Sequence, residues 1–294
     1  MTALDPFGAR LRRSMDRFGP LCVGIDPHAA LLADWGLPDD VAGLERFAMT
    51  VVEAVGGRVA AVKPQSAFFE RFGSRGVAVL ERTIGAARAT GTLVVLDVKR
   101  GDIGSTAAAY ADAYLDPAAP GFADAITVSP YLGFGSLRPM LDLAAANGSG
   151  VFVLALTSNP EGAQVQRALA ADGSGRTVAG EILQQIAAEN LGAAPLGSVG
   201  AVVGATIDPV GIGFDLATLG GPILAPGFGA QGATAEDVRT VFGSALGSVL
   251  AASSRDILRL GPDLLALRAG AVRVADGLRT LVSGAALPQE PSGR

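Results

Sequence analysis

The sequence predicts an α/β protein built as a single (β/α)8 TIM barrel. Short apolar segments recur eight times along the 294 residues, and stretches with helical spacing lie between them. The apolar segments lack the polar alternation of a half-exposed sheet, which is typical of parallel strands covered on both faces. Eight strand–helix units favour closure of the sheet into a barrel.

The eight predicted strands are rich in Val, Ile, Leu and Ala, and each is short enough to cross a barrel once. They cover Leu21–Asp26, Val59–Lys63, Leu93–Lys99, Ala125–Ser129, Val151–Thr157, Val199–Ala205, Pro222–Ala225 and Ser248–Ser253.

The first predicted helix follows Asp39, which could act as its N-cap, and its apolar face runs from Val41 to Val55. An open, doubly wound sheet is the main competing fold. Its G-x-G-x-x-G fingerprint is missing after the first strand, where the sequence reads Gly24–His28 instead. The other predicted helices are Val77–Arg88, Ser105–Tyr114, Leu137–Ala146, Thr177–Leu191, Ala235–Phe242 and Pro262–Val282.

No linker divides the chain, so we expect one catalytic domain over residues 1–286. The tail Leu287–Arg294 holds two prolines and few apolar residues, and it is predicted to be disordered. The Ala/Gly/Ser-rich stretch Gly162–Arg176 is predicted to be an elaborated loop after the fifth strand.

Composition argues against several classes of protein. The net charge of −5 disfavours a general binder of nucleic acid or anionic membranes, and the mean hydropathy of +0.40 comes from apolar residues spread along the chain. No uncharged apolar run reaches the about 18 residues of a membrane span, so we expect a soluble protein. Cys22 is the one cysteine, so no disulfide can form within the chain, and we expect the protein to work in the reducing cytoplasm. The single histidine, His28, excludes a multi-histidine metal site.

Charged residues gather at the predicted carboxyl ends of three consecutive strands. The first strand ends in Asp26, the second in Lys63, and the third in Asp97 and Lys99, with Asp102 in the next loop. Residues two apart in a strand point to the same side. The carboxyl ends of barrel strands form the rim where active sites are built, so we expect these side chains to converge there.

An ordinary ion pair between Asp97 and Lys99 at a strand end is the alternative interpretation. Buried charges are costly, however, and apolar residues would serve stability equally well. A cluster that spans three strand ends therefore favours a catalytic role.

A phosphate site is predicted from the loops after strands seven and eight. Glycines such as Gly227 and Gly229 let backbone N–H groups approach an anion, and Arg255 in the next loop adds a fork of donors. These two loops form the usual phosphate site of such barrels. A tight turn is the alternative for the glycines alone, since the chain holds 40 of them. Ser158, after strand five, either bonds a polar substrate or caps the turn before Pro160.

The segment Asp97–Ile103, with Thr106 after it, resembles the D-x-K-x-x-D-I-x-x-T signature of the orotidine 5′-monophosphate decarboxylases. The segments Gly24–His28 and Val62–Gln65 are similar to the longer bacterial subgroup, type 2, of that family. At position 254 this chain has Ser, where many members of that family have Gly before the Arg. The resemblance covers the chain from the first strand to Arg255.

The resemblance implies a lyase that converts orotidine 5′-monophosphate to uridine 5′-monophosphate in pyrimidine biosynthesis, without cofactor or metal. Lys99 would stabilise and protonate the C6 centre. It also implies a homodimer with shared active sites. The resemblance implies that Lys63, Asp97, Lys99 and Asp102 form an array of alternating lysines and carboxylates. Asp102 and Thr106 would reach into the site of the neighbouring subunit. Asp26 would bind the ribose, Ser158 the pyrimidine, and Gln231 and Arg255 the phosphate.

Two other functions compete with this one. Related barrels, such as ketogulonate-phosphate decarboxylases and hexulose-phosphate synthases, use Mg2+ held partly by a carboxylate at the end of the second strand, where this chain has Lys63. A non-catalytic nucleotide sensor would have no reason to retain Asp97, Lys99 and Asp102 together.

Overall fold

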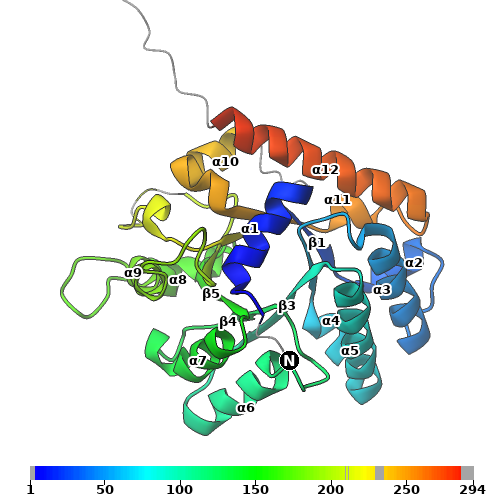
Figure 1. Ribbon diagram of the computed structural model, residues 1–294, viewed down its shortest axis with the longest axis horizontal. Helices are drawn as coiled ribbons and strands as arrows, with labels where there is room; N and C mark the ends of the chain where they lie inside the picture. Colours follow the sequence, from blue (N-terminus) through cyan, green and yellow to red (C-terminus); the bar gives the residue numbers. More distant parts are fainter. Residues whose placement is uncertain (1–3, 209, 211, 229–234, 286–294) are drawn as a thin grey trace, which may run out of the picture.

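The computed structural model describes residues 4–208, 210, 212–228 and 235–285. Its eight strands are all parallel and pair in chain order, and β8 pairs with β1, so the barrel is closed (Figure 1). This confirms the predicted fold. The strands are β1 (Leu21–Ile25), β2 (Ala61–Pro64), β3 (Leu93–Arg100), β4 (Ala125–Val128), β5 (Gly150–Leu156), β6 (Val199–Val203), β7 (Ile223–Pro226) and β8 (Val249–Ser253).

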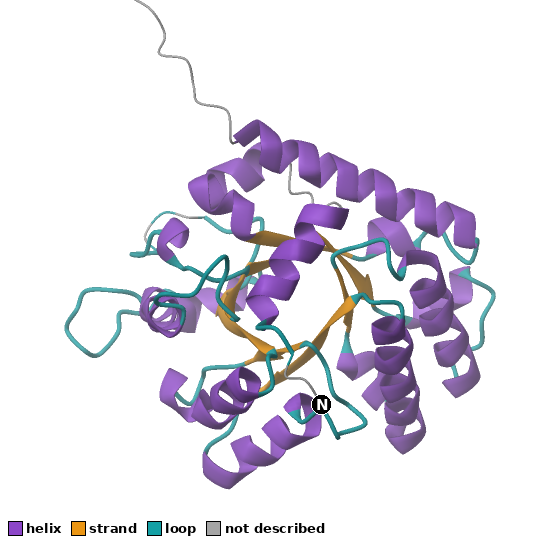
Figure 2. Cartoon of the chain, in the orientation of Figure 1, coloured by secondary structure: helices purple, strands orange, loops and turns teal. Residues whose placement is uncertain are grey.

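Helices surround the barrel, as Figure 2 shows. The helices are α1 (Phe7–Phe18), α2 (Ala29–Asp34), α3 (Val41–Val55), α4 (Ser66–Glu70), α5 (Gly73–Ala89), α6 (Gly104–Leu115), α7 (Arg138–Ala146), α8 (Ala163–Gln166), α9 (Val178–Glu189), α10 (Ala235–Phe242), α11 (Arg255–Leu258) and α12 (Leu264–Ala285), with 3-10 turns at Phe134–Leu137, Pro160–Gly162, Leu216–Thr218 and Gly243–Ser248.

The predicted cap of α3 was wrong by one residue. Asp40, directly before Val41, accepts a hydrogen bond from the backbone N–H of Gly43 at 2.9 Å. The Asp39 carboxylate instead pairs with Arg71. The residue next to the first helical position has the extended backbone that brings its side chain over the free N–H groups, and here that residue is Asp40.

The N-terminal helix α1, which the sequence analysis did not predict, lies across one end of the barrel (Figure 1). Phe7 and Leu11 are fully buried and Met15 nearly so, and all three join the cluster that fills the barrel interior. The Phe7 ring meets the Phe152 ring edge to face, with 5.9 Å between centroids. The α1 helix therefore closes this end of the barrel with apolar side chains.

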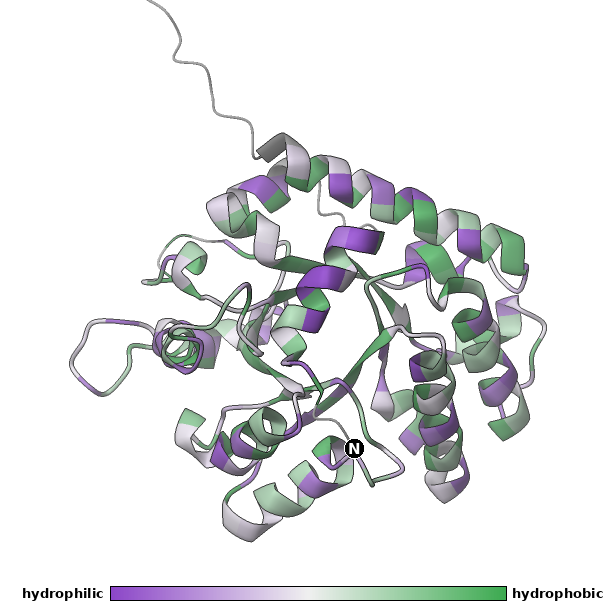
Figure 3. Ribbon diagram, viewed as in Figure 1, coloured by the Kyte–Doolittle hydropathy of each residue, from purple (hydrophilic) through white to green (hydrophobic). Residues whose placement is uncertain are grey.

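The strands separate an inner core from an outer core. Figure 3 shows the strands coloured mostly as hydrophobic. Alternate residues of β1 illustrate the division: Val23 packs in the outer core beneath the helices, whereas Cys22 packs inside the barrel. Burial of the Cys22 thiol raises its pKa to about 12, so the side chain behaves as a small apolar group.

The Gly162–Arg176 stretch is partly ordered into structure. It contains the whole of α8, and an isolated bridge joins Leu169 to Thr177 just beyond its far end. The predicted disordered tail, residues 287–294, lies outside the described residues. Among the residues that are described, no helix combines the length and hydropathy needed to span a bilayer.

Candidate active site

A carboxylate between two ammonium groups lies at the carboxyl ends of β2 and β3. The Lys63 Nζ atom is 2.8 Å from Asp97 Oδ2, and the Lys99 Nζ atom is 2.6 Å from Asp97 Oδ1. Each carboxylate oxygen of Asp97 thus accepts from a different lysine. The predicted convergence of these three side chains is confirmed.

The two lysines keep Asp97 charged although it is only 6% exposed. Burial by itself would raise the pKa of Asp97, but attraction and hydrogen bonds from Lys63 and Lys99 outweigh burial and hold that pKa well below its usual value. Burial by itself would lower the pKa of Lys63. The nearby Asp26 and Asp97 carboxylates outweigh burial and raise that pKa above its usual value. Both groups are therefore ionised at neutral pH.

The backbone at Lys99 departs from a regular strand. Its φ angle is +45°, and no other non-glycine residue among those described has a positive φ. The pairing of β3 with β4 also shifts register between Leu96 and Arg100. A left-handed conformation costs a residue with a Cβ about 1–2 kcal/mol. Strain of this kind persists where surrounding contacts hold it, and it concentrates at functional sites.

Two polar neighbours of this cluster were missed by the sequence analysis. Thr127 on β4 accepts from the Lys99 backbone N–H at 3.0 Å and donates to Asp97 Oδ1 at 2.8 Å. Gln65 accepts from Lys63 Nζ at 3.2 Å. A signal for Thr127 was present, because it is the one polar residue of β4.

Two adjoining cavities open over the cluster. A smaller one of about 280 Å3 is lined by Asp97, Lys99 and Thr127, and a larger cleft of about 670 Å3 is lined by Asp26, Gly227 and Arg255. They share three wall residues, which are Lys63, Pro226 and Ala252. An elongated ligand could therefore place one end beside Lys99 and the other beside Arg255.

The larger cleft presents groups that suit a sugar phosphate. Asp26 Oδ1 and Ser254 Oγ are buried and have no hydrogen-bond partner among the residues that the structure describes. Gly24 leaves room for the Asp26 and Ser254 side chains, since a Cβ at residue 24 would lie 2.8 Å from Ser254 Cβ and 2.9 Å from Asp26 Oδ2. Arg255 is exposed, and its side chain makes no ion pair or hydrogen bond with the other described residues. A carboxylate can accept from hydroxyls, and a guanidinium can bind an anion.

Ser158 follows β5 and is exposed at the edge of a third cavity of about 200 Å3. Thr157 lines both this cavity and the one over the lysine cluster. The Gln166 side chain binds the Thr157 backbone N–H at 2.9 Å and the Thr157 hydroxyl at 2.7 Å. The long loop after β5 is thereby folded back beside Ser158.

Asp102 and Thr106 do not join the cluster within this chain. Asp102 accepts from the neighbouring Ile103 N–H at 2.8 Å, and Thr106 is exposed in the first turn of α6. Neither residue lines the cavities over Lys99 and Arg255. Gly229 and Gln231 of the predicted phosphate loop lie outside the described residues.

The described residues contain no group of three or more His, Cys, Asp or Glu side chains that could hold a metal ion. At the strand ends the nearest partners of Asp97 are the ammonium groups of Lys63 and Lys99. These positive charges would repel a divalent cation from this carboxylate.

Comparison with known proteins places the chain in one family. Residues 19–269 match the profile of the orotidine 5′-phosphate decarboxylase / HUMPS family. The chain is 66% identical to orotidine 5′-phosphate decarboxylase of Salinispora arenicola over 281 residues, which cover 96% of this chain and all of that protein. It is 64% identical to the enzyme of the same name from Streptomyces coelicolor, over 95% of this chain and 99% of the relative.

A solved structure from Streptomyces avermitilis, provisionally assigned as an orotidine 5′-phosphate decarboxylase, matches with a TM-score of 0.92 and 63% identity. The match covers 96% of this chain and 98% of that one. This chain therefore belongs to the orotidine 5′-phosphate decarboxylase / HUMPS family and is a carboxy-lyase.

Proposed function

We propose that this protein decarboxylates orotidine 5′-monophosphate to uridine 5′-monophosphate in pyrimidine biosynthesis. The observation that carries the proposal is the Lys63–Asp97–Lys99 cluster beside a cavity that continues toward Arg255. The names of the relatives with 64–66% identity support the same substrate.

Lys99 is the proposed group at the reacting carbon. When the C6–carboxylate bond breaks, its electron pair stays on C6 and CO2 leaves. A positioned ammonium stabilises this developing charge and then gives C6 a proton, which leaves a neutral amine for solvent to reprotonate. The Lys99 side chain is the most exposed of the three, at 46%, so it can reach a ligand in the cavity.

Asp97 is proposed to lie beside the substrate carboxylate. The two lysines keep it ionised, so the two negative groups repel each other, and loss of CO2 relieves that repulsion. We rank this effect below stabilisation of the carbanion by Lys99. Lys63 holds the Asp97 carboxylate from the opposite side at 2.8 Å.

The rest of the nucleotide is assigned to the larger cleft and the loop after β5. Arg255, with the Gly227–Gln231 loop that includes Gly229, would bind the phosphate. Asp26, whose Oδ1 has no hydrogen-bond partner within the described part of the chain, would accept from the ribose hydroxyls. Ser158 would contact the pyrimidine. Phosphate binding remote from C6 would supply energy used at the reacting carbon.

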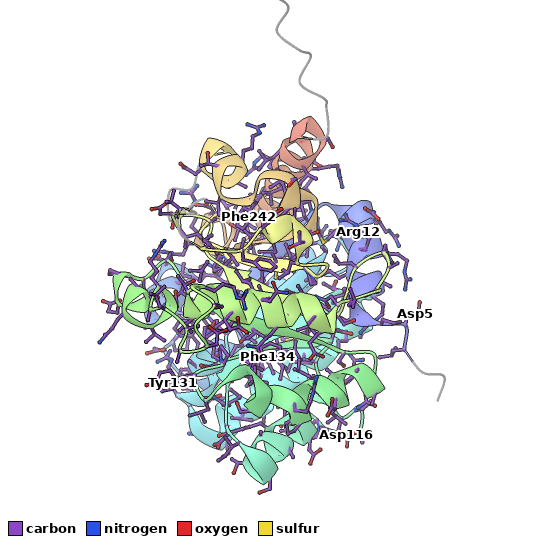
Figure 4. The ribbon with its side chains drawn as sticks, turned by 90° about the vertical axis from the view of Figure 1, so that its left-hand side faces the viewer. Asp5, Arg12, Asp116, Tyr131, Phe134 and Phe242 are labelled. Atoms are coloured by element: carbon purple, nitrogen blue, oxygen red, sulfur yellow. The ribbon has the colours of Figure 1, made fainter. Side chains whose placement is uncertain are left out.

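A homodimer with shared sites is proposed to bring Asp102 and Thr106 to the neighbouring cluster. Ile103, next to Asp102 in the sequence, is 61% exposed, and Tyr131, in the loop after β4, is 76% exposed. Figure 4 shows Tyr131 at the end of the molecule opposite Asp5 and Arg12. A cytoplasmic location, favoured by the lone cysteine, belongs to the same proposal.

The test is the loss of orotate absorbance when the purified protein meets orotidine 5′-monophosphate in excess EDTA. We expect rapid loss with the wild type and none with Lys99→Ala. Because Lys63 stands at the end of β2, we expect EDTA to leave the decarboxylase activity unchanged. EDTA would abolish the activity of a magnesium-dependent enzyme. A folded protein that binds the nucleotide without turnover would overturn the proposal and favour a sensor.

A further inference from the structure

Thr127 links the Lys99 backbone to the Asp97 carboxylate through hydrogen bonds. It is only 1% exposed and lies on β4, inside the barrel next to β3. Its oxygen accepts from the Lys99 backbone N–H, and its distance to Asp97 Oδ1 is 2.8 Å. Asp97 Oδ1 also accepts from Lys99 Nζ at 2.6 Å, so the contacts close a ring.

The direction of each bond in this ring follows from chemistry. A backbone N–H can only donate, so the Thr127 oxygen is the acceptor for Lys99. An ionised carboxylate can only accept, so the single hydroxyl proton of Thr127 goes to Asp97. The hydroxyl is therefore used in both roles at once, and neither a valine nor an alanine could replace it.

The ring also accounts for the strained backbone at Lys99. A φ of +45° requires contacts that hold it, and the N–H of that same residue is the group bound to Thr127. Without the hydroxyl this N–H would lose its partner and Asp97 would lose one of its donors. The Lys99 backbone could then relax toward a regular strand, and its ammonium would move relative to Asp97.

We propose that Thr127 is a positioning residue of the reaction: its hydroxyl ties the Lys99 backbone to the Asp97 carboxylate and so fixes the ammonium at the reacting carbon. The inference rests on the proposed decarboxylation. Thr127 acts through Lys99 and Asp97, and it takes no part in the bond that breaks.

The test compares Thr127→Val, which keeps the branched shape and removes the hydroxyl, with Thr127→Ser, which keeps the hydroxyl. We expect Thr127→Val to lower kcat about 10- to 100-fold, because small displacements of a catalytic group have effects of this size. KM should stay within about threefold, since the proposed phosphate and ribose contacts do not involve Thr127. Thr127→Ser should keep kcat within about threefold of the wild type.

Thr83→Val is the matched control. Thr83 is fully buried in α5, and its hydroxyl donates to the Val79 carbonyl at 2.8 Å, remote from the strand ends. This variant should keep both kcat and KM. If Thr127→Val does not fold, Thr127→Ala removes the same hydroxyl and is compared with Thr127→Ser in the same way.

The outcomes separate this inference from the proposed function. An inactive wild type would overturn the decarboxylation itself. An active wild type with Thr127→Val within threefold of it would overturn the role of Thr127 alone. Equal losses of kcat in Thr127→Val and Thr127→Ser would also overturn it, because they would indicate a packing defect.

Discussion

The two ends of the barrel interior differ in chemistry although the same strands build both. Near α1 the interior is filled by apolar side chains such as Phe7, Leu11 and Phe152. Two residues further along β2 and β3, alanine and valine give way to charge: Ala61 is followed by Lys63, and Val95 by Asp97. The proposed catalytic groups Lys63, Asp97 and Lys99 lie at the end opposite α1.

This difference divides β2 and β3 into a part that stabilises the fold and a part that carries the proposed catalytic groups. The α1 end gains from burial of apolar surface, whereas the other end holds the buried Lys63–Asp97 pair and Lys99, whose backbone is in the left-handed region. Substitutions at the α1 end should therefore change the free energy of unfolding, and substitutions at the strand ends should chiefly change the rate.

The largest effect is expected at Lys99. Lys99→Ala and Lys99→Gly should both lower kcat about 10^4-fold, equivalent to about 5.5 kcal/mol, since each removes the charge and the proton donor. Lys99→Gly should nevertheless be more stable than Lys99→Ala by about 1 kcal/mol, because glycine adopts a positive φ without strain. Urea unfolding checks the order. Equal stabilities would show that the backbone strain contributes nothing.

At the opposite end, Phe7→Ala should lower the free energy of unfolding by about 4 kcal/mol, because it leaves a cavity against Phe152. At a temperature where the variant is folded, kcat should stay within about twofold of the wild type, since the deletion lies at the other end of the barrel. A comparable loss of kcat at full folding would contradict the proposed division.

A smaller effect on stability is expected at Asp97, and it should depend on pH. Because the pKa of Asp97 lies below its unfolded value of about 3.9, the charged carboxylate stabilises the fold above that pH. The stabilisation is lost as the pH falls from about 4 toward the folded-state pKa. Asp97→Asn leaves Lys63 buried without its counter-charge and should cost about 3 kcal/mol at pH 7.

Urea unfolding of the wild type and Asp97→Asn from pH 3 to 7 measures this, and the gap between them should narrow below pH 4. Asp34→Asn, at an exposed carboxyl of α2, serves as the control and should show little change at any pH. A gap that stays constant across the range would mean that the charge of Asp97 does not stabilise the fold.

Much of this architecture could be predicted from the sequence. All eight strands begin and end within two residues of the predicted bounds, because a buried parallel strand is an unbroken apolar run. Lys63, Asp97 and Lys99 were predicted to meet because strand ends of a closed barrel share one rim. The helix cap at Asp39 was misplaced because two adjacent aspartates carry the same local signal, and only the bond to Gly43 distinguishes Asp40.

The sequence by itself determined the barrel and the charged residues at its rim, since hydrophobic periodicity and residue type are local properties. Only the tertiary structure decided that α1 closes one end, that Thr127 binds the Lys99 backbone N–H, and that Asp102 stays apart from the cluster of its own chain. These features depend on contacts between residues distant in sequence. Such contacts are set by how the strands close and which side chains then face each other, and no local pattern encodes them.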